Sequence, residues 1–99
     1  MDMKIIHKHK INIDGTPTEV DLPTDSQYRS TEYLVSKKSL YLWVEVPADL
    51  NAPKEKRTFR VFKTGDGIPD ADQYIGTAID QHQPEAYHLY EVQTDDANL

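Results

Sequence analysis

The amino-acid sequence predicts a mainly β protein, a small antiparallel sandwich or barrel of about seven short strands. Prolines, glycines and clusters of Thr, Ser and Asp divide the 99 residues into short segments. Several segments alternate apolar and polar side chains, and no window carries an apolar stripe with helical spacing over three turns. We therefore expect at most one short helical turn. A single β domain is placed over residues 1–93, and residues 94–99 are expected to form a frayed acidic tail.

Three expected strands precede the middle of the chain and cover residues 5–13, 19–22 and 31–36. The segment Asp14–Pro17 supplies the first turn, because Gly adopts positive φ readily and Pro restricts φ. His7 and His9 stand two residues apart in the first strand and so project to one face. A metal site there would need His82 or His88 to complete it. Because no cysteine or helical histidine spacing supports such a site, we predict no metal and no cofactor.

Residues 40–46 form the clearest strand, preceded by a polar hairpin connection over residues 37–39. Its even positions are all aliphatic, while its odd positions hold Tyr41, Trp43 and Glu45. Apolar side chains on both parities predict a central strand that is at least partly covered on both faces. Within this most apolar segment, Trp43 is expected to lie in the core.

The remaining strands are expected over residues 57–64, 74–79 and 86–92, with a short helical turn at residues 69–73. Alternation in the first of them places Phe59 and Val61 on one face and Arg60 and Phe62 on the other. If this strand pairs antiparallel with residues 40–46, Arg60 can lie over Trp43 in a cation–π contact.

Composition and charge narrow the function classes. The chain has no cysteine, which excludes disulfides, thiolate metal sites and a cysteine nucleophile. No apolar run reaches the length of a membrane span or a signal peptide, so we expect a cytoplasmic protein without a membrane partner. Serine residues occur in no nucleophile elbow, and we find no catalytic constellation, which predicts that the protein is not an enzyme.

Several short motifs resemble, in order and spacing, a family of tailed-bacteriophage and prophage proteins of about 90–100 residues. The motifs are Leu42–Val46, an Asn-Ala-Pro connection at residues 51–53, Lys56–Val61, Thr64-Gly65, Tyr74–Thr77 and the closing Tyr87–Glu91. In the family's glycine-rich loop, the first Gly corresponds to Lys63 here, and the His-Pro pair to Asp66-Gly67. The resemblance implies a phage accessory protein that acts in the cytoplasm of the bacterial host. It implies no activity and no catalytic residues.

The candidate binding site is a basic cluster that runs into a glycine-containing loop. Cationic side chains beside a loop with free backbone N–H groups can hold phosphate or another anion, and an aromatic face beside Arg can anchor a protein. The alternative interpretation is that these charges decorate a solvated strand. The predicted binding residues are Lys54, Lys56, Arg57, Arg60, Phe62, Lys63, Thr64, Gly65 and Gly67.

Charge is distributed unevenly along the chain. All 11 basic residues lie at or before Lys63, whereas residues 64–99 hold eight acidic residues and no basic one. An acidic stretch of this kind can mimic a nucleic-acid backbone if its charges are spaced like phosphates. The acidic residues are Asp66, Asp70, Asp72, Asp80, Glu85, Glu91, Asp95 and Asp96.

We therefore expect a non-enzymatic phage protein that binds a host protein during infection, either in host takeover or as an inhibitor of host defence. A binder of a phosphorylated nucleotide or another small anion is the first alternative, and an acidic nucleic-acid mimic is the second. Short strands leave sheet edges unpaired, so homo-oligomerisation is also open.

Overall fold

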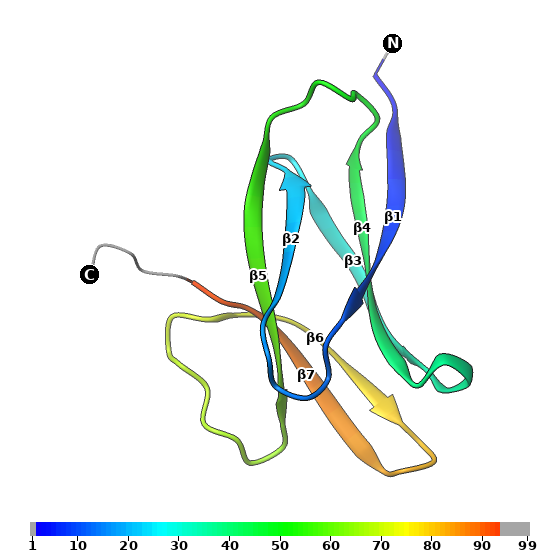
Figure 1. Cartoon of the computed structure of the whole chain (residues 1–99), viewed down its shortest axis with the longest axis vertical. Coiled ribbons are helices and arrows are strands. Elements are labelled where there is room, and N and C mark those ends of the chain that lie inside the picture. The colour runs from blue at the N-terminus through cyan, green and yellow to red at the C-terminus, as the bar shows by residue number, and fades with distance from the viewer. Residues whose placement is uncertain (1, 94–99) are drawn as a thin grey trace.

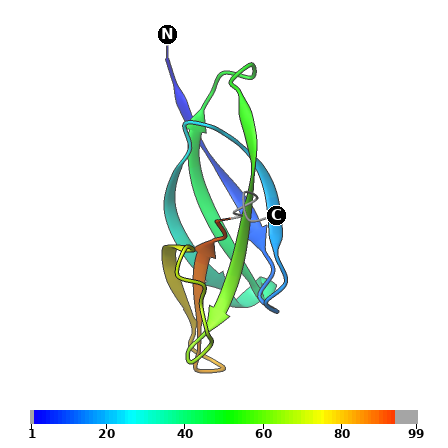
Figure 2. The same ribbon diagram turned by 90° about the vertical axis from the view of Figure 1, so that its left-hand side faces the viewer.

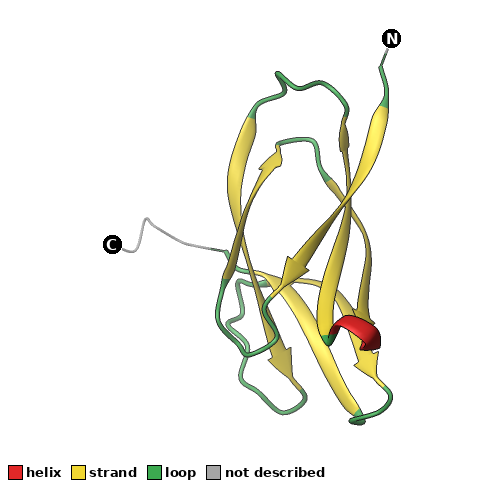
Figure 3. Ribbon diagram, turned by 45° about the vertical axis from the view of Figure 1, so that its right-hand side comes forward, coloured by secondary structure: helices red, strands yellow, loops and turns green. Residues whose placement is uncertain are grey.

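Alternation of apolar and polar residues produces seven strands in the computed structural model, which describes residues 2–93 (Figure 1). A single 3₁₀ turn, η1 (Val35–Lys37), joins the third strand to the fourth (Figure 3). The predicted tail, residues 94–99, lies outside the described residues. The strands are β1 (Lys4–Ile11), β2 (Thr18–Pro23), β3 (Gln27–Leu34), β4 (Ser39–Pro47), β5 (Lys54–Lys63), β6 (Gln73–Asp80) and β7 (Glu85–Glu91).

The strands form two antiparallel sheets that face each other as a sandwich. Sheet A has three strands in the order β1-β4-β3, and sheet B has four in the order β2-β5-β7-β6. The molecule measures 44 × 39 × 16 Å, and Figure 2 shows its narrow profile with the two sheets as separate layers. The predicted β-sandwich is therefore confirmed, and the sheets do not close into a barrel.

The core lies between the inward rows of the two sheets. In β4, the even-numbered residues Leu40, Leu42 and Val44 are fully buried, and they meet Phe59 of β5 and Leu89 of β7 in one apolar cluster. The period-2 alternation predicted for both strands is thus observed. The prediction that β4 is a central strand is confirmed as well, because β1 and β3 pair with its two edges.

Two predictions about Trp43 are wrong. Its side chain lies on the outward row of β4, half-buried beside Tyr41 with ring centroids 6.1 Å apart, and not in the core. The expected contact with Arg60 is also absent, because β4 and β5 belong to different sheets. Among residues 2–93 no strand or helix lies above the outer face of sheet A, and the aromatic rings there are covered by neighbours such as Lys8, which lies over Tyr41 at 4.8 Å.

The helical turn expected at residues 69–73 is not formed. A tight turn closes there instead, in which the backbone N–H of Asp72 donates to the carbonyl of Pro69. The short helix is η1, which ends at Lys38 in the left-handed conformation, with φ 49°. Strand boundaries also differ from those expected: β3 begins four residues earlier, at Gln27, because its pairing with β4 extends to Gln27 opposite Glu45.

Strands β3 and β6, one edge of each sheet, run close together on one side of the sandwich. The register of β3 shifts between Tyr28 and Ser30, and that of β6 shifts between Tyr74 and Gly76. A β-carbon at Gly76 would lie 3.0 Å from the Thr31 hydroxyl oxygen. A larger residue at position 76 would therefore require the Thr31 side chain to move by a few tenths of an ångström, and the irregularities lie where the two edges meet.

Candidate functional site

The alternation of β5 separates the predicted binding residues into two groups. Lys56, Arg60 and Phe62 lie on its outward row together with Lys54, whereas Arg57 shares the inward row with the buried Phe59. Along a strand, Lys56 and Arg60 are about 13 Å apart, which is too far for both to hold one phosphate. The structure therefore does not bring the predicted basic residues together at a single point.

Arg57 joins the two sheets. Its guanidinium donates to the Tyr28 hydroxyl at 2.9 Å and to the Thr24 carbonyl at 3.1 Å, and it lies 3.9 Å from the Glu91 carboxylate. Tyr28 in turn donates to Glu91 at 2.7 Å. Burial and the bond to Glu91 raise the pKa of Tyr28 well above its ordinary value. With its side chain only 17% exposed, Arg57 has the contacts of a structural residue.

The predicted loop also uses its polar groups internally. The backbone N–H of Lys63 donates to the Asp66 carboxylate at 2.8 Å, and the Lys63 ammonium lies 3.7 Å from Glu85. Gly65 adopts a φ of 97°, as the turn requires. Because Asp66 already occupies one amide of the loop, an anion binding at that amide would have to displace a carboxylate. The exposed Gly67 follows in the same loop.

A group of aromatic residues lies on the outward side of sheet B, with Phe62 buried and Tyr74 exposed. The Arg60 guanidinium lies 5.2 Å from the centre of the Phe62 ring, and Phe62 meets Tyr90 edge-on at 5.5 Å. Tyr90 meets Tyr74 at 5.4 Å, and the Tyr74 side chain is 58% exposed. These four residues come from β5, β7 and β6, which are adjacent in the sheet. We call Arg60, Phe62, Tyr74 and Tyr90 the aromatic face.

A row of hydrogen bonds runs beside the aromatic face. The two ring nitrogens of His88 are each 3.0 Å from a threonine hydroxyl, Thr64 on one side and Thr77 on the other. The Thr77 hydroxyl is in turn 2.7 Å from that of Tyr74. Neutral imidazole offers one donor and one acceptor, so this row orients both threonine hydroxyls and the exposed tyrosine. The predicted residue Thr64 is thereby connected to the aromatic face.

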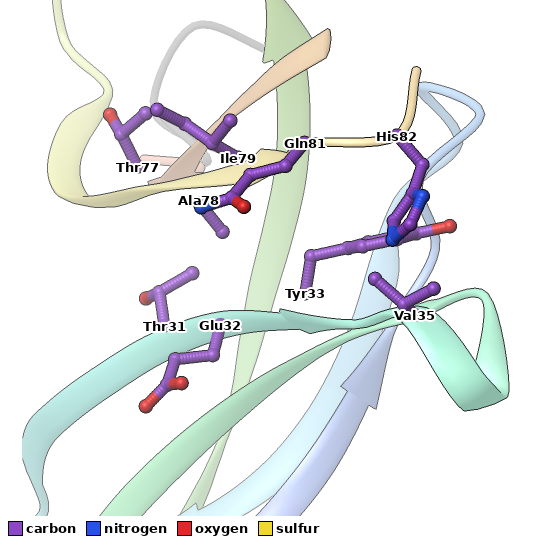
Figure 4. A pocket seen from close by; sticks show the side chains of 9 residues that line it. All are labelled: Thr31, Glu32, Tyr33, Val35, Thr77, Ala78, Ile79, Gln81 and His82. Atoms are coloured by element: carbon purple, nitrogen blue, oxygen red, sulfur yellow. The ribbon is translucent and has the colours of Figure 1, made fainter. Parts of the chain in front are cut away.

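Two hollows lie outside the predicted binding residues. A groove of about 450 Å³ separates β3 from β6, and Figure 4 shows side chains from both strands and from the turn after β6 pointing into it. A second hollow of about 880 Å³ lies at the end of the sandwich near Asp2, Asp25 and Asp49. None of the nine predicted binding residues lines either hollow. The first groove is lined by Thr31, Glu32, Tyr33, Val35, Thr77, Ala78, Ile79, Gln81 and His82.

The histidines do not assemble into one site. His7 and His9 lie near each other on β1 with ring centroids 6.4 Å apart, whereas His88 lies on the outer face of sheet B. Burial and the neighbouring His7 imidazole lower the pKa of His9. Within residues 2–93, no three metal-ligating side chains form a group. The same residues contain no helix that is long and apolar enough to cross a membrane.

Sequence reasoning identified Arg60, Phe62 and Thr64 but missed their partners on β6 and β7. Tyr74, His88 and Tyr90 were assigned to strands, and alternation places His88 and Tyr90 on one face. What local sequence does not reveal is that β7 pairs with β5, so that Tyr90 lies directly opposite Arg60. This long-range pairing creates the surface.

Comparison with known proteins identifies the family. No curated protein and no solved structure matches the chain. One family, described as Domain of unknown function (DUF7352), matches residues 3–99. The match extends over nearly the whole chain, including all seven strands and the aromatic face. This protein therefore belongs to the DUF7352 family of small uncharacterised proteins.

Proposed function

We propose that this protein is a non-enzymatic bacteriophage accessory protein that binds a host protein through its aromatic face. The observation that carries the proposal is the continuous row of aromatic rings with Arg60 at one end. Tyr and Arg are enriched among the residues that dominate binding energy at protein interfaces. The row ends in the exposed Tyr74, and Ile79, which is also exposed, lies five residues farther along β6. The exposed Tyr74 ring packs on Tyr90, which in turn packs on the buried Phe62, and a ring held in this way supports binding to a protein surface.

The opposite outer face supports this role less well. On sheet A, Glu45 is bound from two sides, by Lys4 at 3.3 Å and by Arg29 at 2.9 Å. The ammonium of Lys8 covers the Tyr41 ring. A partner would have to disrupt these internal contacts, whereas the tyrosine of β6 is already presented to solvent. The outer face of sheet B is therefore the better docking surface.

A macromolecular partner is preferred to a nucleotide or another small anion. Small ligands bind in concave sites that bury most of their surface, and the predicted residues line neither of the two hollows described above. The four residues of the aromatic face, of which Phe62 is buried and Tyr74 is exposed, line neither hollow. The acidic-mimic alternative is also weaker, because Glu91 points inward to Tyr28 and Glu85 lies near Lys63. Asp95 and Asp96 lie outside the described residues.

The setting in the host cytoplasm, with a role in host takeover or inhibition of defence, is part of the proposal. Its support is the resemblance of residues 40–77 to proteins of tailed bacteriophages and prophages. A protein that acts in infection without chemistry must act by binding, which agrees with the presence of an exposed aromatic surface.

Affinity capture from the lysate of infected host cells tests the proposal. The bait is the whole chain, compared with Tyr74→Ala on the aromatic face and Tyr41→Ala on the outer face of sheet A as the matched control. We expect the wild type and Tyr41→Ala to retain the same host protein and Tyr74→Ala to lose it, because the exposed ring contributes about 2 kcal/mol or more. Loss of the host protein by Tyr41→Ala, with retention by Tyr74→Ala, would contradict the proposal. Thermal stabilisation by a nucleotide panel, without protein capture, would favour the small-anion alternative.

A further inference from the structure

Strand β1 forms an exposed edge of sheet A. In Figure 1 it lies at the margin of the molecule, with no strand beyond it. Of the other edges, β3 and β6 approach each other at Thr31 and Gly76, and β2 is shorter and ends in Pro23. β1 has eight residues and contains no proline. It is thus the longest edge open to pairing within the described residues.

The hydrogen-bond pattern identifies which backbone groups of β1 are free. The Met3 carbonyl accepts from the Ala48 N–H, so these two residues form a hydrogen-bonded pair with β4. In an antiparallel ladder such pairs alternate with non-bonded ones, and Lys4 lies opposite Pro47, which has no N–H. The backbone groups that point away from β4 therefore belong to every second residue, namely Lys4, Ile6, Lys8 and Lys10.

The same four residues carry a distinctive set of side chains. Their side chains project to the outer face of sheet A, with Ile6 53% exposed among three lysines, of which Lys4 is paired with Glu45 at 3.3 Å. Within residues 2–93, neither Lys8 nor Lys10 has a carboxylate within ion-pair distance. On the other face of the strand, Ile5 points toward sheet B and is still 46% exposed. A fourth strand in sheet A would cover Ile5.

We propose that the free edge of β1 binds an extended acidic segment of a partner protein, which adds a fourth strand to sheet A. Neighbouring strands lie about 4.8 Å apart, so alternate acidic side chains of the incoming segment would lie beside Lys8 and Lys10 on the outer face. The intervening positions would be apolar and would cover Ile5. A second copy of this chain does not fit, because pairing β1 with β1 places lysines beside lysines. This surface is separate from the aromatic face, so the two proposals stand or fall independently.

The test uses the whole chain and a synthetic peptide of about ten residues in which Glu and Val alternate, matched to the length of β1. A peptide of alternating Lys and Val and a single-stranded oligonucleotide are the comparison probes. We expect calorimetry to detect binding of the acidic peptide and not of the basic one. Binding of neither peptide, or of both equally, would overturn the proposal. Equal binding of the oligonucleotide would also overturn it, since a general polyanion surface would then explain the result.

Two variants separate the charge from the strand edge. The double variant Lys8→Glu/Lys10→Glu should lose affinity for the acidic peptide by about tenfold or more and gain binding to the basic one, a swap that misfolding cannot produce. Ile6→Pro removes one free N–H and leaves the ladder with β4 intact, so it should weaken binding to a similar degree, whereas Ile6→Thr should not. Unchanged binding by Ile6→Pro would contradict strand addition.

Amide hydrogen exchange gives the most local test. The amides of Ile5, His7 and His9 point to β4 and should exchange slowly in the free protein. Those of Ile6 and Lys8 should become protected only when the acidic peptide is bound. If the bound peptide protected amides elsewhere and none on β1, the assignment of β1 as the binding edge would be refuted.

Discussion

Replacing Arg57 and Arg60 separately tests whether the structure divides the basic cluster correctly. The side chain of Arg57 is mostly buried and has two hydrogen bonds, at 2.9 and 3.1 Å, and its removal also deprives the Glu91 carboxylate of a cation at 3.9 Å. We expect Arg57→Ala to lower the free energy of unfolding by about 2–3 kcal/mol. Arg60→Ala loses one hydrogen bond, to the Gly15 carbonyl, and the contact of a partly exposed guanidinium with the Phe62 ring, which together are worth about 1 kcal/mol.

Urea denaturation followed by circular dichroism measures both free energies, with an unchanged m-value as the control for a common denatured state. In a domain of this size, the Arg57→Ala loss corresponds to a Tm decrease of about 10 °C or more. In partner capture, Arg60→Ala should lose more of the host protein than Arg57→Ala, since Arg60 belongs to the aromatic face and Arg57 does not. Equal stability of the two variants, or greater damage from Arg60→Ala, would refute the division of the cluster into a structural and a binding residue.

Three further predictions concern glycine packing and pH. Gly76→Ala should lower the free energy of unfolding by about 1–3 kcal/mol in the same assay, because its β-carbon would meet the Thr31 hydroxyl at 3.0 Å. The control Gly67→Ala has open space around its β-carbon and should change that free energy by no more than about 0.5 kcal/mol. Because the pKa of His9 is lowered in the folded protein, His9 gains its proton in the unfolded state first as the pH decreases, so stability should fall below pH 6.5. A pH series of thermal melts should show a smaller loss in His9→Gln. Because the pKa of Tyr28 is raised, the unfolded state ionises first above pH 10, so stability should fall with rising pH; an unchanged alkaline slope in Tyr28→Phe would contradict this.

Local sequence was sufficient to predict the strands and their inward faces. The alternation in residues 40–46 placed Leu42 in the core, since period-2 burial is a property of each strand by itself. Trp43 was misplaced because the sequence of one strand does not tell whether a second layer covers its other face. The partition of β4 and β5 into different sheets depends on pairing between distant residues, which no single segment encodes.

The candidate site was predictable to a similar extent. The sequence correctly placed Arg60 and Phe62 on one face of β5, and it grouped Arg57 with them because it is close in sequence. The inward position of Arg57 depends on Tyr28, which lies 29 residues away along the chain. Tyr74 and Tyr90 complete the aromatic face through the pairing of β6 with β7 and of β7 with β5, and a basic cluster in the sequence gives no sign of them.

Site-specific photocrosslinking tests the central claim, that the aromatic face is the surface bound by the host protein, most directly. A photoreactive phenylalanine derivative replaces Tyr74 in one protein and Tyr41 in another, and each is expressed in infected host cells and irradiated. Both positions carry tyrosine on the outer face of a sheet, so the substitutions are closely matched. We predict that position 74 yields a discrete crosslinked host protein and that position 41 does not yield the same protein. A host crosslink from position 41 alone, or none from position 74, would contradict the account.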